Sequence, residues 1–188
     1  MKQDTSTYYV WIGGSCDYGH KERAGGAAVV IEHNGNIISR DVISDLHTTE
    51  FRMMLTLMVK VMQEIPEGSD ILFLTNAAYI QNFDMTPTAK SANPDLIIQC
   101  ITEKERHNSV GVKIVQYHKS PLLIETHDRA TEAMAKTRKE FHQKNKYKQY
   151  RRDGKHIPDE PPISSVHFLC NRLTTTYCKN YFKPWAFL

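Results

Sequence analysis

The pattern of residues 7–44 constrains the fold more than any other part of the sequence, because it predicts three consecutive strands. Residues 7–16 are apolar and end beside a Gly-Gly pair, and residues 25–32 form a second apolar run. Asn34-Gly35, the strongest short signal for a hairpin, connects this run to a third strand over 37–44. We therefore expect an antiparallel meander at the start of the domain.

The next segment predicts an amphipathic helix that begins near residue 49. Thr48 or Thr49 supplies an N-cap, and Glu50 follows in the first turn, where an acidic side chain suits the helix dipole. Pro66 and Gly68 end the helix. Apolar residues recur at the spacing of one buried helix face; they are Met54, Leu55, Met58, Val61, Met62 and Ile65.

The rest of the domain alternates strands with helices. Residues 70–76 form a short apolar run typical of a buried parallel strand, and a short helix is expected from Ala77. A further helix begins at Pro94, a last strand spans 110–118, and a strong helix-forming segment spans 127–141, beginning near Thr126. This order predicts an α/β fold, with a mixed sheet flanked by helices.

Composition excludes several classes of protein. The chain has 188 residues, of which 40% are hydrophobic, as in a globular domain and unlike a disordered chain. No apolar run is long enough to cross a membrane, and residues 1–10 lack the apolar stretch of a secretory signal. The four cysteines form no CxxC pair. We expect a reduced, cytoplasmic protein.

The charge is distributed unevenly along the chain. The formal net charge is +3, but residues 136–155 carry nine basic and two acidic side chains, or +7, which leaves −4 for the remainder. Beyond Pro158 the sequence is rich in aromatic residues. We expect one domain over 1–141, followed over 142–188 by a basic linker and an aromatic C-terminal extension that packs on the domain or on a partner.

Several local strings resemble the ribonuclease H (RNase H) family, in the order in which that family has them. The first is Ile12-Gly13-Gly14-Ser15-Cys16, which resembles Thr-Asp-Gly-Ser, and the second is residues 48–55 (TTEFRMML), similar to Thr-Thr-Asn-x-Arg-Met-Glu-Leu. Residues 75–80 (TNAAYI) resemble Thr-Asp-Ser-x-Tyr-Val. Residues 93–96, 115–118 (VQYH) and 127–131 (HDRAT) are similar to Asn-x-Asp-Leu, Val-x-Gly-His and Asn-Glu-x-Ala-Asp.

The resemblance implies an RNase H-like mixed sheet, three antiparallel strands followed by parallel ones, with a C-terminal extension. It also implies the family's activity, hydrolysis of the RNA strand of RNA–DNA hybrids by two divalent ions, which three Asp and one Glu hold. Two such ions about 4 Å apart repel by roughly 17 kcal/mol at an effective dielectric near 20, so a carboxylate cluster is needed. In this sequence the four matching positions hold Gly13, Met54, Asn76 and Thr131.

None of these four side chains is a carboxylate, so we expect no catalytic residues and no bound magnesium cofactor. The histidine of the family's catalytic loop is retained as His118. A relocated metal site would have to use Glu50, one turn before Met54, and Asp128, close to Thr131. Those two acidic residues equally suit the first turns of their helices, where they need no metal.

Three functions remain open at this stage. The first is a catalytically inactive module that binds an RNA/DNA hybrid or RNA. The expected contacts come from the retained strings and from the basic segment; they are Ser15, Cys16, Arg52, Lys144, Lys146, Lys148, Arg151 and Arg152. The second is a protein-interaction scaffold, with a homodimer or another protein held through the aromatic C-terminal segment and no role in nucleic-acid binding. The third is a metal-dependent ribonuclease with a relocated site. No membrane partner is expected.

Overall fold

The structure is a computed structural model that describes residues 7–153. The strands are β1 (Thr7–Cys16), β2 (Gly25–His33), β3 (Asn36–Asp45), β4 (Asp70–Thr75) and β5 (Ser109–Ile114). The helices are α1 (Glu50–Glu64), α2 (Pro94–Lys104) and α3 (Pro121–Arg152), with two short 3₁₀ helices, η1 (Ala78–Asn82) and η2 (Tyr117–Lys119). No helix in this described range is long and apolar enough to cross a membrane.

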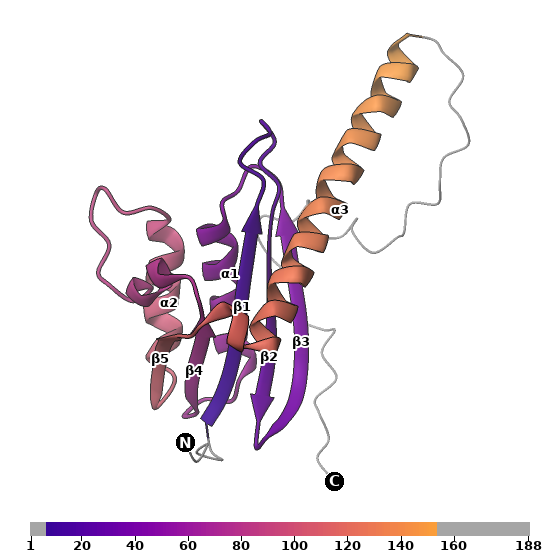
Figure 1. Ribbon diagram of the computed structural model, residues 1–188. Coiled ribbons are helices and arrows are strands. Elements are labelled where there is room, and N and C mark those ends of the chain that lie inside the picture. Colours follow the sequence, from indigo (N-terminus) through magenta and orange to yellow (C-terminus); the bar gives the residue numbers. More distant parts are fainter. Residues whose placement is uncertain (1–6, 154–188) are drawn as a thin grey trace. The chain divides into compact units, whose positions relative to one another are not determined.

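The five strands form one mixed sheet in the order β3-β2-β1-β4-β5 (Figure 1). β1, β2 and β3 pair antiparallel, whereas β4 pairs parallel with both β1 and β5. The β2–β3 turn places Asn34 and Gly35 at φ 54° and 73°, the left-handed pair that a tight hairpin turn requires. The predicted meander and the mixed sheet are confirmed.

Helices cover both faces of the sheet (Figure 1). α1 lies on one face, and its predicted apolar residues are all buried in the main core with Val10, Ile12 and Val29 of the sheet. α3 lies on the opposite face, where Leu123, Thr126 and Ala130 are fully buried. The Thr49 hydroxyl accepts a hydrogen bond from the backbone N–H of Arg52 and caps α1 as expected.

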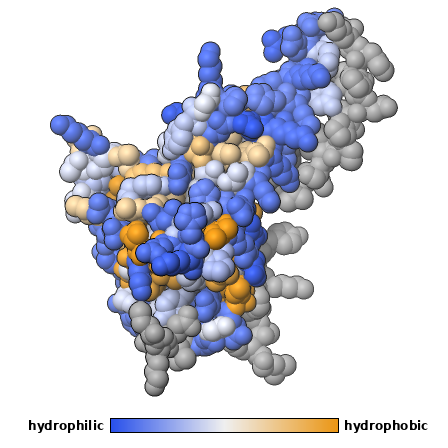
Figure 2. Space-filling view, in the orientation of Figure 1, coloured by the Kyte–Doolittle hydropathy of each residue, from blue (hydrophilic) through white to orange (hydrophobic). Residues whose placement is uncertain are grey.

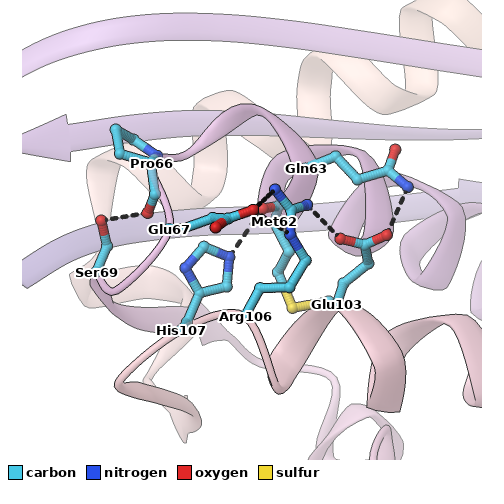
Figure 3. A network of polar contacts seen from close by, with 8 residues as sticks. All are labelled: Met62, Gln63, Pro66, Glu67, Ser69, Glu103, Arg106 and His107. Carbon is cyan, nitrogen blue, oxygen red and sulfur yellow. Dashed lines mark hydrogen bonds and ion pairs between the residues drawn. The ribbon is translucent and has the colours of Figure 1, made fainter.

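The ends of α1 and α2 are held together by a polar network (Figure 3). The Arg106 guanidinium pairs with Glu67 at 2.8 Å and with Glu103 at 2.6 Å. Gln63 of α1 donates to Glu103 at 2.9 Å, and Nε2 of the buried His107 lies 2.8 Å from the carbonyl oxygen of Met62. This network holds the C-terminal end of α1 to the C-terminal end of α2.

Two predicted boundaries differ from the structure. The last strand ends at Ile114 rather than at 118, because residues 117–119 turn into η2. α3 begins at Pro121 rather than near Thr126, since proline suits the first helical position and the Ser120 carbonyl accepts from the N–H groups of Leu123 and Ile124. It continues to Arg152 because Lys, Gln and Arg favour a helix there.

The chain divides into two compact units between Lys146 and Tyr147. The domain boundary that the sequence suggests, after residue 141, falls inside α3. The aromatic segment at the C-terminus lies outside the described residues.

Candidate functional site

The first of the four matched positions, Gly13, lies on β1 and is buried against α3. An added Cβ atom at Gly13 would lie 2.8 Å from Oγ1 of Thr126 and 3.1 Å from the backbone nitrogen of His127. Contacts this short are not tolerated without movement, and Thr126 Oγ1 is itself held by a hydrogen bond to the Leu123 carbonyl oxygen. The first turns of α3 therefore occupy the space that any side chain at position 13 would need.

The second position, Met54, belongs to the core. Its side chain is fully buried on α1, under the carboxyl end of β1. An added Cβ atom at Gly14 would lie 2.9 Å from Met54 Cγ, and the Tyr79 hydroxyl donates a weak hydrogen bond to Met54 Sδ at 3.5 Å. Thioether sulfur is a poor ligand for magnesium, and this sulfur faces a tyrosine.

The remaining two positions are exposed. Asn76 follows β4, and Thr131 lies on α3. Their uncharged oxygens are the only oxygen ligands that the four matched side chains offer. Two of the four matched positions are buried in the packing, and the other two are exposed and carry no charge. Such a set of side chains does not fit a pair of divalent cations, which needs a cluster of carboxylates.

The acidic residues considered for a relocated site, Glu50 and Asp128, do not form a metal-binding cluster. Asp128 is exposed on α3, and Glu50 lies over Gly14 on the α1 side of the sheet. Within residues 7–153, no group of three or more His, Cys, Asp or Glu side chains is arranged to hold a metal ion.

His118 is exposed in η2, before α3. Its ring contacts that of Tyr117 edge-on, with the centroids 5.2 Å apart, and Tyr117 also contacts His127 at 5.6 Å. The retained histidine thus lies in a small aromatic group beside the segment that packs against Gly13.

The expected nucleic-acid contacts of β1 and α1 are bonded to other parts of the protein. Arg52 forms a two-pronged ion pair with Asp95, with nitrogen–oxygen distances of 3.2 and 2.9 Å, and also donates to Asn93 at 3.2 Å. The hydrogen bonds between these two side chains, together with their opposite charges, raise the pKa of Arg52 and lower that of Asp95. Arg52 therefore ties α1 to the start of α2.

Ser15 and Cys16 also point toward protein atoms. The Ser15 hydroxyl donates to Met134 Sδ at 3.6 Å, and the Cys16 thiol donates to the Thr48 carbonyl oxygen at 3.6 Å. Burial raises the pKa of the Cys16 thiol above its ordinary value, which keeps it protonated as a donor.

Three side chains that sequence reasoning did not group together meet beside Met54. The backbone N–H of Glu50 donates to the Tyr18 hydroxyl at 3.4 Å. Phe51 packs edge-on against Tyr79, with the ring centroids 5.4 Å apart. Burial raises the pKa of the Tyr79 hydroxyl, and the nearby Glu50 carboxylate raises it further. We call Tyr18, Glu50 and Tyr79 the tyrosine–glutamate cluster.

The basic segment forms the second half of α3, and Figure 2 shows the exposed side of this helix as hydrophilic. Lys144, Lys148 and Arg152 are exposed and recur every four residues, so they project from one side of the helix over about 12 Å. We call these three residues the basic face. Lys146 is exposed on the other side, and Arg138, nearer the start of the segment, is ion-paired with Asp17.

No protein-family model matches the sequence, and no curated protein is significantly similar to it. Solved structures do match. LC9-RNase H1, a type 1 RNase H with the type 2 active-site motif, superimposes with a TM-score of 0.60 and 20% identity, covering 73% of this chain and 76% of that one. The N-terminal RNase H domain of a Mycobacterium tuberculosis protein, solved as a fusion with maltose-binding protein, superimposes with a TM-score of 0.58 and 8% identity. The match covers 72% of this chain and 98% of that one.

A third structure, LC11-RNase H1 in complex with RNA/DNA hybrid, gives a TM-score of 0.54 at 15% identity, covering 69% of this chain and 97% of that one. At these identities the likeness concerns the backbone arrangement, and it agrees with the strand order and with the helices on both faces of the sheet. The chain therefore has the RNase H-like fold.

Proposed function

We propose that this chain is a catalytically inactive RNase H-like protein that binds nucleic acid. The observation that carries the loss of catalysis is the packing at positions 13 and 54. Gly13 is closed off by Thr126 and His127, and Met54 is fully buried beneath Tyr79. Because a two-metal mechanism needs carboxylates that converge on an open site, the filled positions leave no place for the ions.

The binding role is supported by the basic face. Lys144, Lys148 and Arg152 are exposed on one side of α3, and within residues 7–153 none of the three forms a salt bridge. Lysine and arginine at a polyanion release condensed counterions, which gives affinity that does not depend on sequence and falls with salt. One structure with this fold, LC11-RNase H1, was solved with an RNA/DNA hybrid.

A binding experiment with a matched control tests this proposal. Fluorescence anisotropy of a labelled RNA/DNA hybrid, measured from about 50 to about 200 mM salt, gives the affinity and its salt dependence. We expect the triple charge reversal K144E/K148E/R152E to weaken binding at least about tenfold and to flatten the salt dependence. Lys90, Lys113 and Lys119 are also exposed, so K90E/K113E/K119E makes the same change in net charge elsewhere and is expected to bind nearly as the parent does.

Two outcomes would contradict the proposal. Absence of hybrid binding at about 50 mM salt, or an equal effect of both triple variants, removes the basic face as the binding surface. Cleavage of the hybrid in Mg²⁺ or Mn²⁺, retained after repurification and lost in a variant of Glu50 or Asp128, contradicts the inactive assignment and restores the relocated site.

A further inference from the structure

The tyrosine–glutamate cluster is an exposed aromatic surface with a carboxylate at its centre. Tyr18 is 62% exposed, and Tyr79 is 43% exposed. Both rings are held at their hydroxyl ends, since the Tyr18 hydroxyl accepts from the backbone N–H of Glu50 and the Tyr79 hydroxyl donates to Met54 Sδ. Part of each ring is exposed to a flat partner, although Phe51 packs edge-on against Tyr79 and contacts that ring.

The position of the cluster also favours a ligand. Tyr18 follows the carboxyl end of β1, and Tyr79 lies in η1 just after β4, which is parallel to β1. Ligands of α/β sheets bind beyond the carboxyl ends of parallel strands, where loops from neighbouring strands meet. In this chain Gly13 and Met54 at that edge are buried, and Tyr79, whose hydroxyl contacts Met54, is exposed there.

Glu50 provides acceptors for a partner that carries N–H donors. A carboxylate has about four acceptor sites, more than the single proton of the neighbouring Tyr79 hydroxyl could occupy. Guanine presents two adjacent donors on its Watson–Crick edge, at N1 and at the exocyclic N2 amino group, which match the two oxygens of a carboxylate. The same carboxylate repels a phosphate, so a nucleotide that binds here must present its base rather than its backbone.

Arg23 supplies the opposite charge nearby. It lies in the β1–β2 connection, its side chain is exposed, and its carbonyl oxygen accepts from the backbone N–H of Thr48, two residues before Glu50, at 3.2 Å. Within residues 7–153 its guanidinium has no ion-pair partner. A cation at this point attracts a phosphate and repels an incoming lysine or arginine side chain, which favours a nucleotide over a basic peptide as the occupant.

We propose that Tyr18, Glu50 and Tyr79 bind an unpaired guanine base of a single-stranded nucleic acid, with Arg23 beside the adjoining phosphate. This inference rests on the proposed nucleic-acid binding and adds what the protein selects. Base faces inside a duplex are stacked on their neighbours and cannot reach the rings, so single strands or unpaired ends are preferred to a blunt hybrid.

Three labelled probes of about 12 nucleotides test this selection by anisotropy. They are oligouridine with one central guanosine, the same strand with inosine in place of guanosine, and a blunt RNA/DNA hybrid. We expect the guanosine strand to bind about tenfold more tightly than the hybrid and clearly more tightly than the inosine strand, which lacks the N2 amino group. Equal binding of all three probes would overturn the proposal.

Variants distinguish binding at the tyrosine–glutamate cluster from binding at the basic face. Tyr18→Ala is expected to weaken binding of the guanosine strand about tenfold and to change hybrid binding less than about twofold, because one stacked base is lost. Glu50→Gln is expected to reduce the preference for guanosine over inosine to less than about twofold. Met85 is 60% exposed and lies outside the cluster, so Met85→Ala is the matched control and should bind as the parent does.

The remaining outcomes are each decisive. Unchanged binding by Tyr18→Ala, with its melting temperature within about 2 °C of the parent, overturns the inference while leaving the proposed function intact. Binding of an arginine-rich peptide that depends on both Tyr18 and Glu50 assigns the cluster to a protein partner and also overturns it. Failure of every probe at about 50 mM salt contradicts the proposed function instead.

Discussion

The carboxyl end of β1 and the second half of α3 differ in the charge and the burial of their side chains. At β1, the positions that an active relative fills with charge hold Gly13 and Met54, and both are buried in contact with other side chains. Along α3, charged residues gather on an exposed side, where water solvates them at little cost. The comparison shows that the two positions at β1 and α1 are buried in the packing of the domain, whereas the basic residues of α3 lie on the helix surface.

The largest expected effect comes from placing a carboxylate at a buried position among the four that match the family's carboxylates. Met54→Glu places an unpaired charge in the core and is expected to lower the free energy of unfolding by about 3–5 kcal/mol. Asn76→Asp makes a comparable change at an exposed position and is expected to stay within about 0.5 kcal/mol. Urea unfolding of both variants measures the difference. Equal effects would mean that position 54 is as open to solvent as position 76, against the packing described above.

A smaller effect is expected at Gly13. Gly13→Ala forces a methyl group against Thr126 and the backbone of His127, which should cost about 1–3 kcal/mol of stability. Gly19→Ala is the control, because its added Cβ atom meets only Asp17 Oδ1 at an ordinary 3.4 Å. Thermal unfolding followed by circular dichroism compares the two. A neutral Gly13→Ala would mean that α3 does not close this position.

The pH dependence tests how the middle of α3 is held to the β1–β2 connection through Arg138 and Asp17. Hydrogen bonds from His20 and Arg138 lower the pKa of Asp17 below its model-compound value of 3.8. A carboxylate with a lowered pKa stabilises the fold above its unfolded-state pKa, and that stability is lost as the pH falls through the folded-state pKa. We expect stability to fall below about pH 4, and Asp17→Asn to have a flatter profile there. Identical slopes for parent and variant between pH 4 and pH 2 would show that Asp17 does not anchor α3.

Much of the fold could be predicted from the sequence because local signals agreed with one another. Asn34-Gly35, the Thr49 cap and the apolar spacing of α1 each specify an element within a few residues, and all three are confirmed. The start of α3 was placed too late, because the helical character of 121–126 depends on Ser120 and Pro121 rather than on an amphipathic pattern.

The candidate site was predictable only in part. The sequence shows which side chains lie at the four positions matched to carboxylates. It does not show that Thr126 packs against Gly13, because the two residues are more than a hundred positions apart. The tyrosine–glutamate cluster combines residues from the β1–β2 connection, α1 and η1, and no short string contains that information. Arg52 illustrates the same limit, since its pair with Asp95 is visible only once α2 is in place.

The measurement that tests the central claim most directly is a titration with Mn²⁺, which replaces Mg²⁺ at oxygen sites and can be followed by calorimetry and by the melting temperature. If packing has replaced the metal centre, about 10 mM Mn²⁺ gives no saturable heat, and neither the metal nor a chelator moves the melting temperature by more than about 1 °C. Saturable binding that raises the melting temperature by several degrees, and that is lost when Glu50 or Asp128 is neutralised, would show that a metal site persists and would contradict the account.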